Sequence, residues 1–348
     1  MGVSCSKPLE TAFDRLNTFL NLDWVTRWSP IAKTFPLFRL PLLTLIEVLK
    51  SLDPTELFIL SKCSRKVANC VHYAGTKKWK LSVDVAKKCI KINNTYRLFI
   101  IETSKKTSWR YDEDSDTWFC KSQKSENSKF ELQKVLAQLQ NAFRCPVTSF
   151  EHSHWMRSDQ CWLSVLNYIT HNQIQPLESF AICGIYKKKD LEWALQNVRV
   201  SRKMNIYLYN MPNFTINFQP ICEQIKFFSR DNLRLDLMKF KSCKYMELSL
   251  SLTMHDLDVF MKEWKAGGFP SLQYMGFSSI QSNWVDDILD FRKSEISQGG
   301  VRRRLVIDEN LSVECTGGVD IQADNGTKAT MQMSRGPPDW FMLFVWND

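Results

Sequence analysis

The chain has 348 residues, of which 44% are hydrophobic and 12% aromatic, and its formal net charge at pH 7 is +9. This composition can bury a sizeable core in two or three domains and excludes a chain that is disordered throughout. The longest apolar runs, such as Phe341–Trp346, fall far short of the roughly 20 residues that a membrane-spanning helix needs.

The first seven residues match the pattern for N-myristoylation, with Gly2 first after removal of the initiator methionine and Ser6 in place. Cys5 offers a site for a second acyl chain, which matters because one myristoyl group alone gives only marginal membrane binding. The alternative is that so short a pattern arises by chance. Residues Leu9 to Leu20 then show helical spacing of apolar side chains and predict a short amphipathic helix.

The most informative stretch follows and predicts short, leucine-rich helices. Pro41 suits the first turn of the first helix, where its missing N–H would go unbonded in any case. Asp53-Pro54 ends this helix and starts the next, with Asp53 as the cap and Glu56 at the third helical position. A third helix is expected over Ser64 to His72. Three short helices cannot easily hide this much leucine in their own small core, so we expect a partner to bury part of it.

These residues resemble the F-box pattern in order and spacing. In that family the three helices bind the Skp adaptor, which connects to a cullin scaffold, so the resemblance implies a substrate-recognition adaptor of a ubiquitin ligase. One departure is Leu43, because many F-boxes carry Glu at that position; this departure fits the nematode branch of the family. The alternative is a generic helical hairpin with proline caps. The residues expected to contact Skp are Leu40, Pro41, Leu45, Val48, Leu49, Leu52, Pro54, Leu57 and Leu60.

From Trp79 to Cys120 the apolar pattern changes to a period of two residues, which is typical of strands. Strands are predicted at Tyr96–Ile101 and Ser108–Tyr111, joined by a polar turn, and a further apolar pair stands at Trp118-Phe119. Lys121 to Ser128 are polar and predict an exposed loop.

Helix and strand alternate after residue 131, with a period of roughly 25–30 residues that lies in the range of leucine-rich and similar repeats. The predicted helices contain Leu132–Phe143, Trp162–Ile169 and Leu191–Leu195, and the strands that follow them contain Val147–Phe150, Ser179–Cys183 and Met204–Tyr209. No strict repeat consensus is present. A stack of such units makes a curved sheet, and such surfaces often bind other proteins.

The clearest helix–strand unit lies at Thr253 to Phe277. Thr253 is the expected helix cap, Asp256 stands at the third helical position, and Gly267-Gly268 end the helix. Near the end of the sequence, Asn325-Gly326 lies between two strand-like segments and is a strong hairpin signal.

These segments resemble the type 2 F-box-associated domain of nematode F-box proteins. The resemblance rests on the residues Asp256-Leu257, Phe260, Trp264, Gly267-Gly268 and Leu272, and on the tail from Gly318 to Trp346. Within the family this domain holds the target protein, so the resemblance implies target binding in the C-terminal part of the chain.

The predicted fold class is α/β, with an N-terminal three-helix F-box followed by an irregular helix–strand solenoid that is leucine-rich-repeat-like and ends in a β-hairpin. The predicted divisions are an N-terminal segment at 1–34, the F-box at 35–75, a β-rich connector at 76–130 and the F-box-associated helix–strand domain at 131–348.

Other functions have less support. The sequence contains no phosphate-binding glycine loop, nucleophile elbow or HExxH motif, so we expect a non-catalytic adaptor without a cofactor. His152 and His154 are interpreted as polar surface side chains rather than metal ligands. The eleven scattered cysteines form no CxxC pair and indicate reduced thiols in the cytosol or nucleus.

Two alternatives stay open at this stage. The first is a repeat-type interaction scaffold that is not coupled to a ubiquitin ligase. The second is a basic protein that binds RNA, or a membrane through the acylated N-terminus. The lysines and arginines are spread along the chain, with short runs such as Arg302–Arg304, and this spread disfavours nucleic acid.

Overall fold

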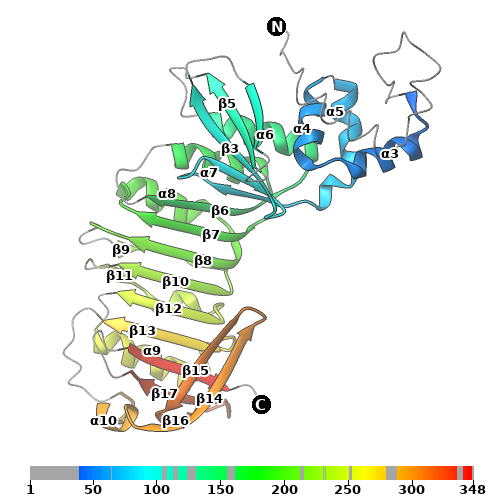
Figure 1. Ribbon diagram of the computed structural model, residues 1–348. Helices are drawn as coiled ribbons and strands as arrows, with labels where there is room; N and C mark the ends of the chain where they lie inside the picture. Colours follow the sequence, from blue (N-terminus) through cyan, green and yellow to red (C-terminus); the bar gives the residue numbers. More distant parts are fainter. Residues whose placement is uncertain are drawn as a thin grey trace. The chain divides into compact units, whose positions relative to one another are not determined.

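The computed structural model describes residues 39–63, 65–103, 108–112, 117–123, 131–154, 161–211, 215–229, 231, 233–250, 253–279, 288–334 and 340–346. The acylation pattern at Gly2 and Cys5 and the helix predicted over Leu9–Leu20 lie outside these residues. The fold is mixed α/β, and the chain divides into two compact units (Figure 1). The first unit comprises Met1–Glu151 and Gln160–Gln175, and the second comprises His152–Asp159 and Pro176–Asp348. The four-part division drawn from the sequence stays a prediction.

The first unit begins with the three predicted helices, which are confirmed as α3 (Leu42–Ser51), α4 (Pro54–Cys63) and α5 (Arg65–Val71). Two short 3-10 helices, η2 (His72–Ala74) and η3 (Thr76–Lys78), connect them to the sheet. Helix α3 packs against η2, whereas α4 packs against α5 and against α6 (Glu131–Phe143). Helix α5 also packs against η2 and α6.

The sheet of the first unit has the strand order β6-β1-β2-β3-β5-β4. Its strands are β1 (Leu81–Asp84), β2 (Cys89–Ile92), β3 (Tyr96–Thr103), β4 (Ser108–Asp112), β5 (Thr117–Gln123) and β6 (Val147–His154). The predicted strands β3 and β4 both form, but they are not neighbours, because β5 pairs parallel to β3 and antiparallel to β4. This pairing extends β5 through Gln123, so the loop predicted from Lys121 begins later than expected; residues 124–128 lie outside the described residues.

Helices α6 and α7 (Cys161–Asn172) follow the predicted apolar stripes and pack against each other. The amide of Gln173, directly after α7, ties this helix to the sheet. Its Oε1 accepts from the backbone N–H of Val147 at 3.0 Å, and its Nε2 donates to the carbonyl of the same residue at 2.9 Å. The side chain therefore extends the hydrogen bonding at the start of β6.

The second unit contains a run of parallel strands followed by antiparallel ones. The parallel strands are β7 (Leu177–Gly184), β8 (Val200–Leu208), β10 (Gln224–Ser229), β12 (Tyr245–Leu250) and β13 (Tyr274–Ser279). Beyond β13 the sheet continues through β18 (Trp340–Trp346), β17 (Lys328–Met333) and β16 (Val319–Gln322), all antiparallel to their neighbours. Short strands β9 (Thr215–Ile216) and β11 (Arg234–Leu235) form a separate parallel pair. The likeness to leucine-rich repeats stays a prediction.

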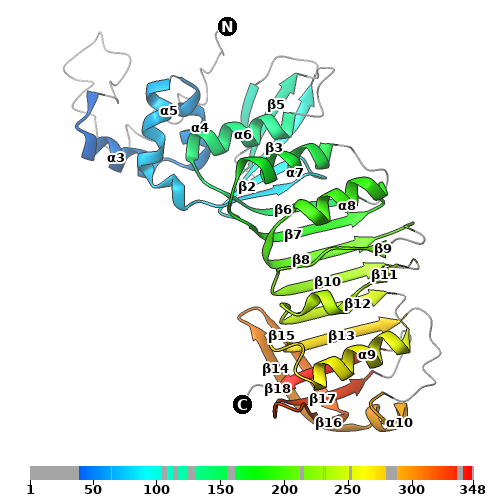
Figure 2. The same cartoon turned by 180° about the vertical axis from the view of Figure 1, so that it is seen from behind.

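The two faces of this sheet are covered differently. Helices α8 (Lys188–Asn197) and α9 (Met254–Lys265) lie on one face, and on the other lies a two-stranded ribbon of β14 (Gly299–Asp308) and β15 (Leu311–Gly317) (Figures 1 and 2). The short helices η5 (Leu237–Phe240) and α10 (Lys293–Ile296) complete the unit. Large apolar side chains fill the helix side, including Phe180, Phe227, Phe260 and Phe277, all of which are fully buried.

Local signals for turns and caps were reliable in this unit. The capping box of α9 is confirmed, because the backbone N–H of Asp256 donates to Thr253 Oγ1 at 3.2 Å and the backbone N–H of Thr253 donates to Asp256 Oδ2 at 2.8 Å. The hairpin predicted at Asn325-Gly326 is also confirmed, as the turn between β16 and β17. Among the described helices, none has the length and apolar character needed to cross a membrane.

Candidate functional site

The junction between α3 and α4 is fixed by a reciprocal cap. Asp53 Oδ1 accepts from the backbone N–H groups of Thr55 at 2.7 Å and Glu56 at 2.8 Å. Glu56 Oε2 in turn accepts from the backbone N–H of Asp53 at 3.0 Å. Pro54 occupies the first helical position, where it has no N–H to leave unsatisfied. The predicted capping box is therefore confirmed and sets the turn between the two helices.

Replacing Asp53 with Ala is expected to lower the free energy of unfolding by about 1 kcal/mol, because two backbone N–H groups lose their acceptor. Asp53→Ser is the matched control, since a serine hydroxyl can still accept one of these hydrogen bonds, and it is expected to keep most of the stability. Urea denaturation monitored by circular dichroism measures the free energy of unfolding of both variants. Equal destabilisation by Ala and Ser would contradict a capping role.

Most of the residues predicted to contact Skp lie inside the chain's own core. Seven of the nine are buried: Leu45, Val48, Leu49, Leu52, Pro54, Leu57 and Leu60. Leu40 is half-buried and Pro41 is exposed. The seven buried side chains hold the helices together, so a role for them in partner contact stays a prediction.

The exposed apolar residues of α3 are two that sequence reasoning did not select. Leu42 keeps 56% of its surface exposed and Leu43 keeps 78%. They are adjacent in the first turn of α3 and follow the exposed Pro41. Leu43 is also the residue that departs from the common F-box pattern, and this departure was the feature of the sequence that could have drawn attention to it. The structure thus places a small apolar surface, Pro41–Leu43, at the start of α3.

An aromatic cluster anchors α4 to the rest of the first unit. The Phe58 ring meets Phe143 of α6 edge-on at 6.1 Å between centroids, and Trp79 meets the same ring at 5.0 Å. Thr76 Oγ1 donates to the backbone carbonyl of Phe143 at 2.7 Å in a buried position. Phe143 therefore joins α4, η3 and α6 around one side chain.

The charged groups near these helices are mostly solvated. Glu47 and Lys50 of α3 form an ion pair at 2.8 Å, but both side chains are exposed, so the pair contributes little to stability. Lys62 Nζ lies 4.5 Å from the centroid of the Phe58 ring and donates to Gln138 Oε1. Desolvation of this amine lowers the pKa of Lys62 to about 8. Among the residues that the structure describes, no group of three or more His, Cys, Asp or Glu side chains is placed to hold a metal ion.

The structure corrects the interpretation of His152 as a surface residue. Its side chain is buried, and Nδ1 lies 2.8 Å from the Tyr186 hydroxyl, which also donates to the carbonyl of His152 at 3.2 Å. Nothing in the sequence indicates that His152 contacts Tyr186, which lies 34 positions further along the chain. Burial raises the pKa of Tyr186.

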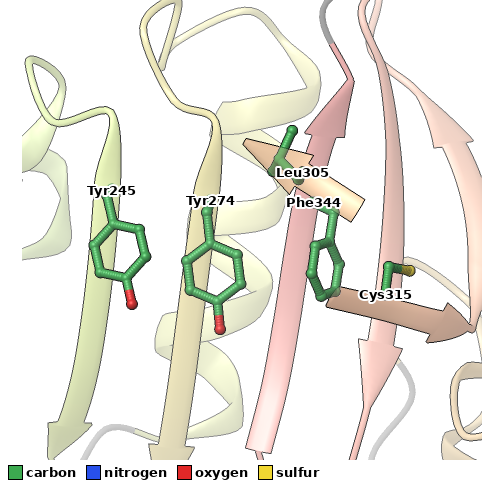
Figure 3. Packing of buried hydrophobic residues seen from close by; sticks show 5 residues of the cluster. All are labelled: Tyr245, Tyr274, Leu305, Cys315 and Phe344. Atoms are coloured by element: carbon green, nitrogen blue, oxygen red, sulfur yellow. The ribbon is translucent and has the colours of Figure 1, made fainter. Parts of the chain in front are cut away.

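In the second unit, the ribbon covers a row of aromatic side chains (Figure 3). Tyr245, Tyr274 and Phe344 stand side by side on β12, β13 and β18, and Leu305 and Cys315 of the ribbon pack on them. The ring centroids are 5.0 Å apart between the two tyrosines and 5.4 Å apart between Tyr274 and Phe344. Burial raises the pKa of both tyrosine hydroxyls.

An arginine of the ribbon holds it to the sheet. Arg303 Nη2 donates to Asp320 Oδ1 of β16 and to Thr330 Oγ1 of β17, both at 2.8 Å. The guanidinium also lies 4.7 Å from the centroid of Trp346 on β18. The hydrogen bond from Arg303 and that from Thr330 lower the pKa of Asp320. Three strands are thus joined to the ribbon through one side chain.

Comparison with known families finds matches to two segments of the chain. Residues 37–79 match the model of the F-box domain, and residues 212–277 match the model described as F-box associated. The first match covers α3 to η3, and the second runs from β9 into β13. Neither the curated proteins nor the solved structures give a match to the chain. The chain therefore carries an F-box domain and an F-box-associated segment; its assignment to the nematode branch stays an expectation.

Proposed function

We propose that this chain is the substrate-recognition subunit of a Skp–cullin–F-box ubiquitin ligase. The F-box helices bind a Skp adaptor, and through it a cullin, while the second unit binds a target protein. The chain itself catalyses nothing. Its effect is proximity, because tethering raises the effective concentration of a target lysine near the ubiquitin that is to be transferred.

The observation that carries the proposal is the F-box match at residues 37–79, within which Leu42 and Leu43 remain exposed. Burying one leucine side chain stabilises a complex by roughly 1.5–3 kcal/mol, so two adjacent leucines can anchor a partner. In this proposal Leu40–Leu43 form the centre of the Skp contact. The buried set from Leu45 to Leu60 acts indirectly, by fixing where α3 begins and how it is oriented.

Co-expression with an affinity-tagged Skp adaptor tests the proposal directly. The full chain is expected to co-purify with the adaptor and to elute with it as a single species in size-exclusion chromatography. The chain expressed alone, with its apolar surface uncovered, is expected to be less soluble. Separate elution of the two proteins at micromolar concentration would show that the N-terminal helices serve another purpose.

A further inference from the structure

The ribbon-side face of the second unit carries aligned rows of side chains. The register places Lys203 of β8 opposite Gln224 of β10, and Gln224 opposite Tyr245 of β12. Because side chains directly opposite each other share a face of a sheet, Lys203 and Gln224 lie on the same side as Tyr245, under the ribbon side. A second row, two residues further along, contains Asn205, Lys226 and Glu247 on the same strands.

A third row on this face is aromatic. Tyr207 of β8 lies opposite Phe228 of β10, with their ring centroids 6.1 Å apart. Tyr209, just after β8, adds a third ring at 6.2 Å from Phe228. Tyr207, Tyr209 and Phe228 are all half-buried, in contrast to Tyr245, Tyr274 and Phe344, which the ribbon buries. The same kind of surface is therefore covered at one end of the sheet and partly exposed at the other.

The ribbon shows what this face accepts. It brings aliphatic side chains onto the aromatic row, with Leu305 buried and Ile307, Leu311 and Val313 packed beside it. At its tip, Gln224 Nε2 donates to Asp308 Oδ2, so the ribbon meets the first residue of β10. Both views show the ribbon over the β13 and β18 end of the sheet, with none of its length over β7 (Figures 1 and 2). An extended segment with aliphatic side chains is thus the occupant that this chain itself already uses.

The charges of the exposed part of this face add a second requirement. Arg202 and Lys203 are both exposed at the start of β8, and Lys203 makes no ion pair with any described residue. Lys226, by contrast, is neutralised by Glu247, whose Oε2 lies 2.5 Å from the amine and also accepts from the Tyr245 hydroxyl at 2.6 Å. The backbone N–H of Asn310, the amide of Gln224 and the charge of Arg202 lower the pKa of Asp308, so Arg202 has a counter-charge in the ribbon. The uncompensated positive charge therefore stands at Lys203, about 13 Å along the strand from Tyr207 at ~3.3 Å per residue.

We infer that the ribbon-side face of β8 and β10 binds an extended segment of the target protein, with an acidic residue at Lys203 and an aliphatic residue on the Tyr207–Phe228–Tyr209 rings. Four residues of extended chain span the distance between these two contacts. The inference rests on the proposed function and names the class of target that the second unit would hold. A single-stranded nucleic acid would also stack on aromatic rings, but it carries no aliphatic side chains like those that the ribbon packs on the same face.

A defined peptide library tests the inference with the full chain in complex with the Skp adaptor. Fluorescent peptides of about 12 residues carry Asp and Ile four positions apart, in either order, with the other positions drawn from Ser, Thr, Asn and Gln. One matched library replaces Asp with Lys, and another replaces Ile with Ser. By fluorescence anisotropy, the Asp/Ile library is expected to bind about tenfold more tightly than either matched library.

Charge reversal at one exposed residue gives the decisive comparison. Lys203→Glu is expected to invert the preference, so that the Lys/Ile library binds more tightly than the Asp/Ile library. Lys189→Glu, the same change at an exposed residue of α8 on the helix side, is expected to leave the preference unaltered. Equal binding of the three libraries, an unaltered preference in Lys203→Glu, or tighter binding of an oligouridine than of any library would overturn the inference.

The same preparations separate this inference from the proposed function. If the variants and the parent chain all bind the Skp adaptor but show no peptide preference, the ribbon-side face is not the target site and the adaptor role stands. If the parent chain does not bind the adaptor, the ligase role fails, and the peptide measurements on the chain alone still decide whether the face binds an acidic, aliphatic segment.

Discussion

Replacing Leu42 and Leu43 together with glutamate is expected to abolish binding of the Skp adaptor while leaving both units folded. The two side chains are 56% and 78% exposed, so the folded chain loses little when they become polar. In the complex, the variant forfeits roughly 1.5–3 kcal/mol for each leucine and must also desolvate two carboxylates. The affinity should therefore fall at least about a hundredfold, as measured by calorimetry with purified adaptor.

The matched control is Ile174→Glu. Ile174 is 91% exposed and belongs to the first unit, so the change removes an even more exposed aliphatic side chain that is not part of α3. Its affinity for the adaptor and its melting temperature are expected to equal those of the parent chain. Unaltered adaptor binding by the Leu42→Glu, Leu43→Glu variant would mean that the start of α3 is not the contact.

The buried leucines are unsuitable for this test. Leu49 has no exposed surface, and Leu52 is also buried, so glutamate at either position places a charge in the core of the helical group. Loss of adaptor binding in such a variant would follow from unfolding of α3 and α4 and would say nothing about the contact surface. Surface exposure, which periodicity does not report, thus decides which leucines can be changed.

Replacing Gly318 with Ala is expected to destabilise the second unit by roughly 2–4 kcal/mol. Gly318 joins β15 to β16 with φ +92°, a conformation that a residue with a Cβ adopts only with strain. A Cβ at this position would stand 2.2 Å from the carbonyl oxygen of Met331 on β17. Because the atom it meets belongs to the backbone, the strand itself would have to move.

Gly326→Ala separates the two causes. Gly326 has nearly the same φ, +89°, but the nearest atom to its added Cβ is Gln322 Nε2 at 3.9 Å. Only the backbone conformation is penalised there, so a loss of about 1 kcal/mol is expected. Urea denaturation monitored by tryptophan fluorescence gives the loss of stability in both variants. If the two variants lose the same stability, the close approach of Gly318 to β17 has no energetic weight.

Local signals in the sequence predicted local structure well. Asp53-Pro54, Thr253 with Asp256, and Asn325-Gly326 each specify a cap or turn through residues only a few positions apart, and each feature is present. The helices α3 to α9 follow from apolar periodicity for the same reason. Such patterns need no knowledge of what lies elsewhere in the chain.

The pairing of strands that are distant in the sequence could not be predicted from local patterns. β3 and β4 are consecutive strands, yet β5 lies between them, paired parallel to β3 and antiparallel to β4. The sequence patterns did not predict the strands β10 and β12 or the ribbon. This holds even for β10, along which buried and partly buried side chains alternate in the structure. Which leucines of the helical group are buried could not be predicted for a related reason. Periodicity shows which face of α4 is apolar, but the ring that covers Phe58, Phe143, comes 85 positions later in the chain.

The position of β18 has a consequence for the order of assembly. This strand is synthesised after β17, yet it occupies an interior position in the sheet, with β13 on one side and β17 on the other. Before β18 pairs, β13 and β17 each have an edge with unpaired backbone N–H and C=O groups beside large apolar side chains. Such edges are prone to pair with strands of other molecules. Premature termination before Trp340 would therefore yield a product directed toward aggregation rather than a shortened but functional adaptor.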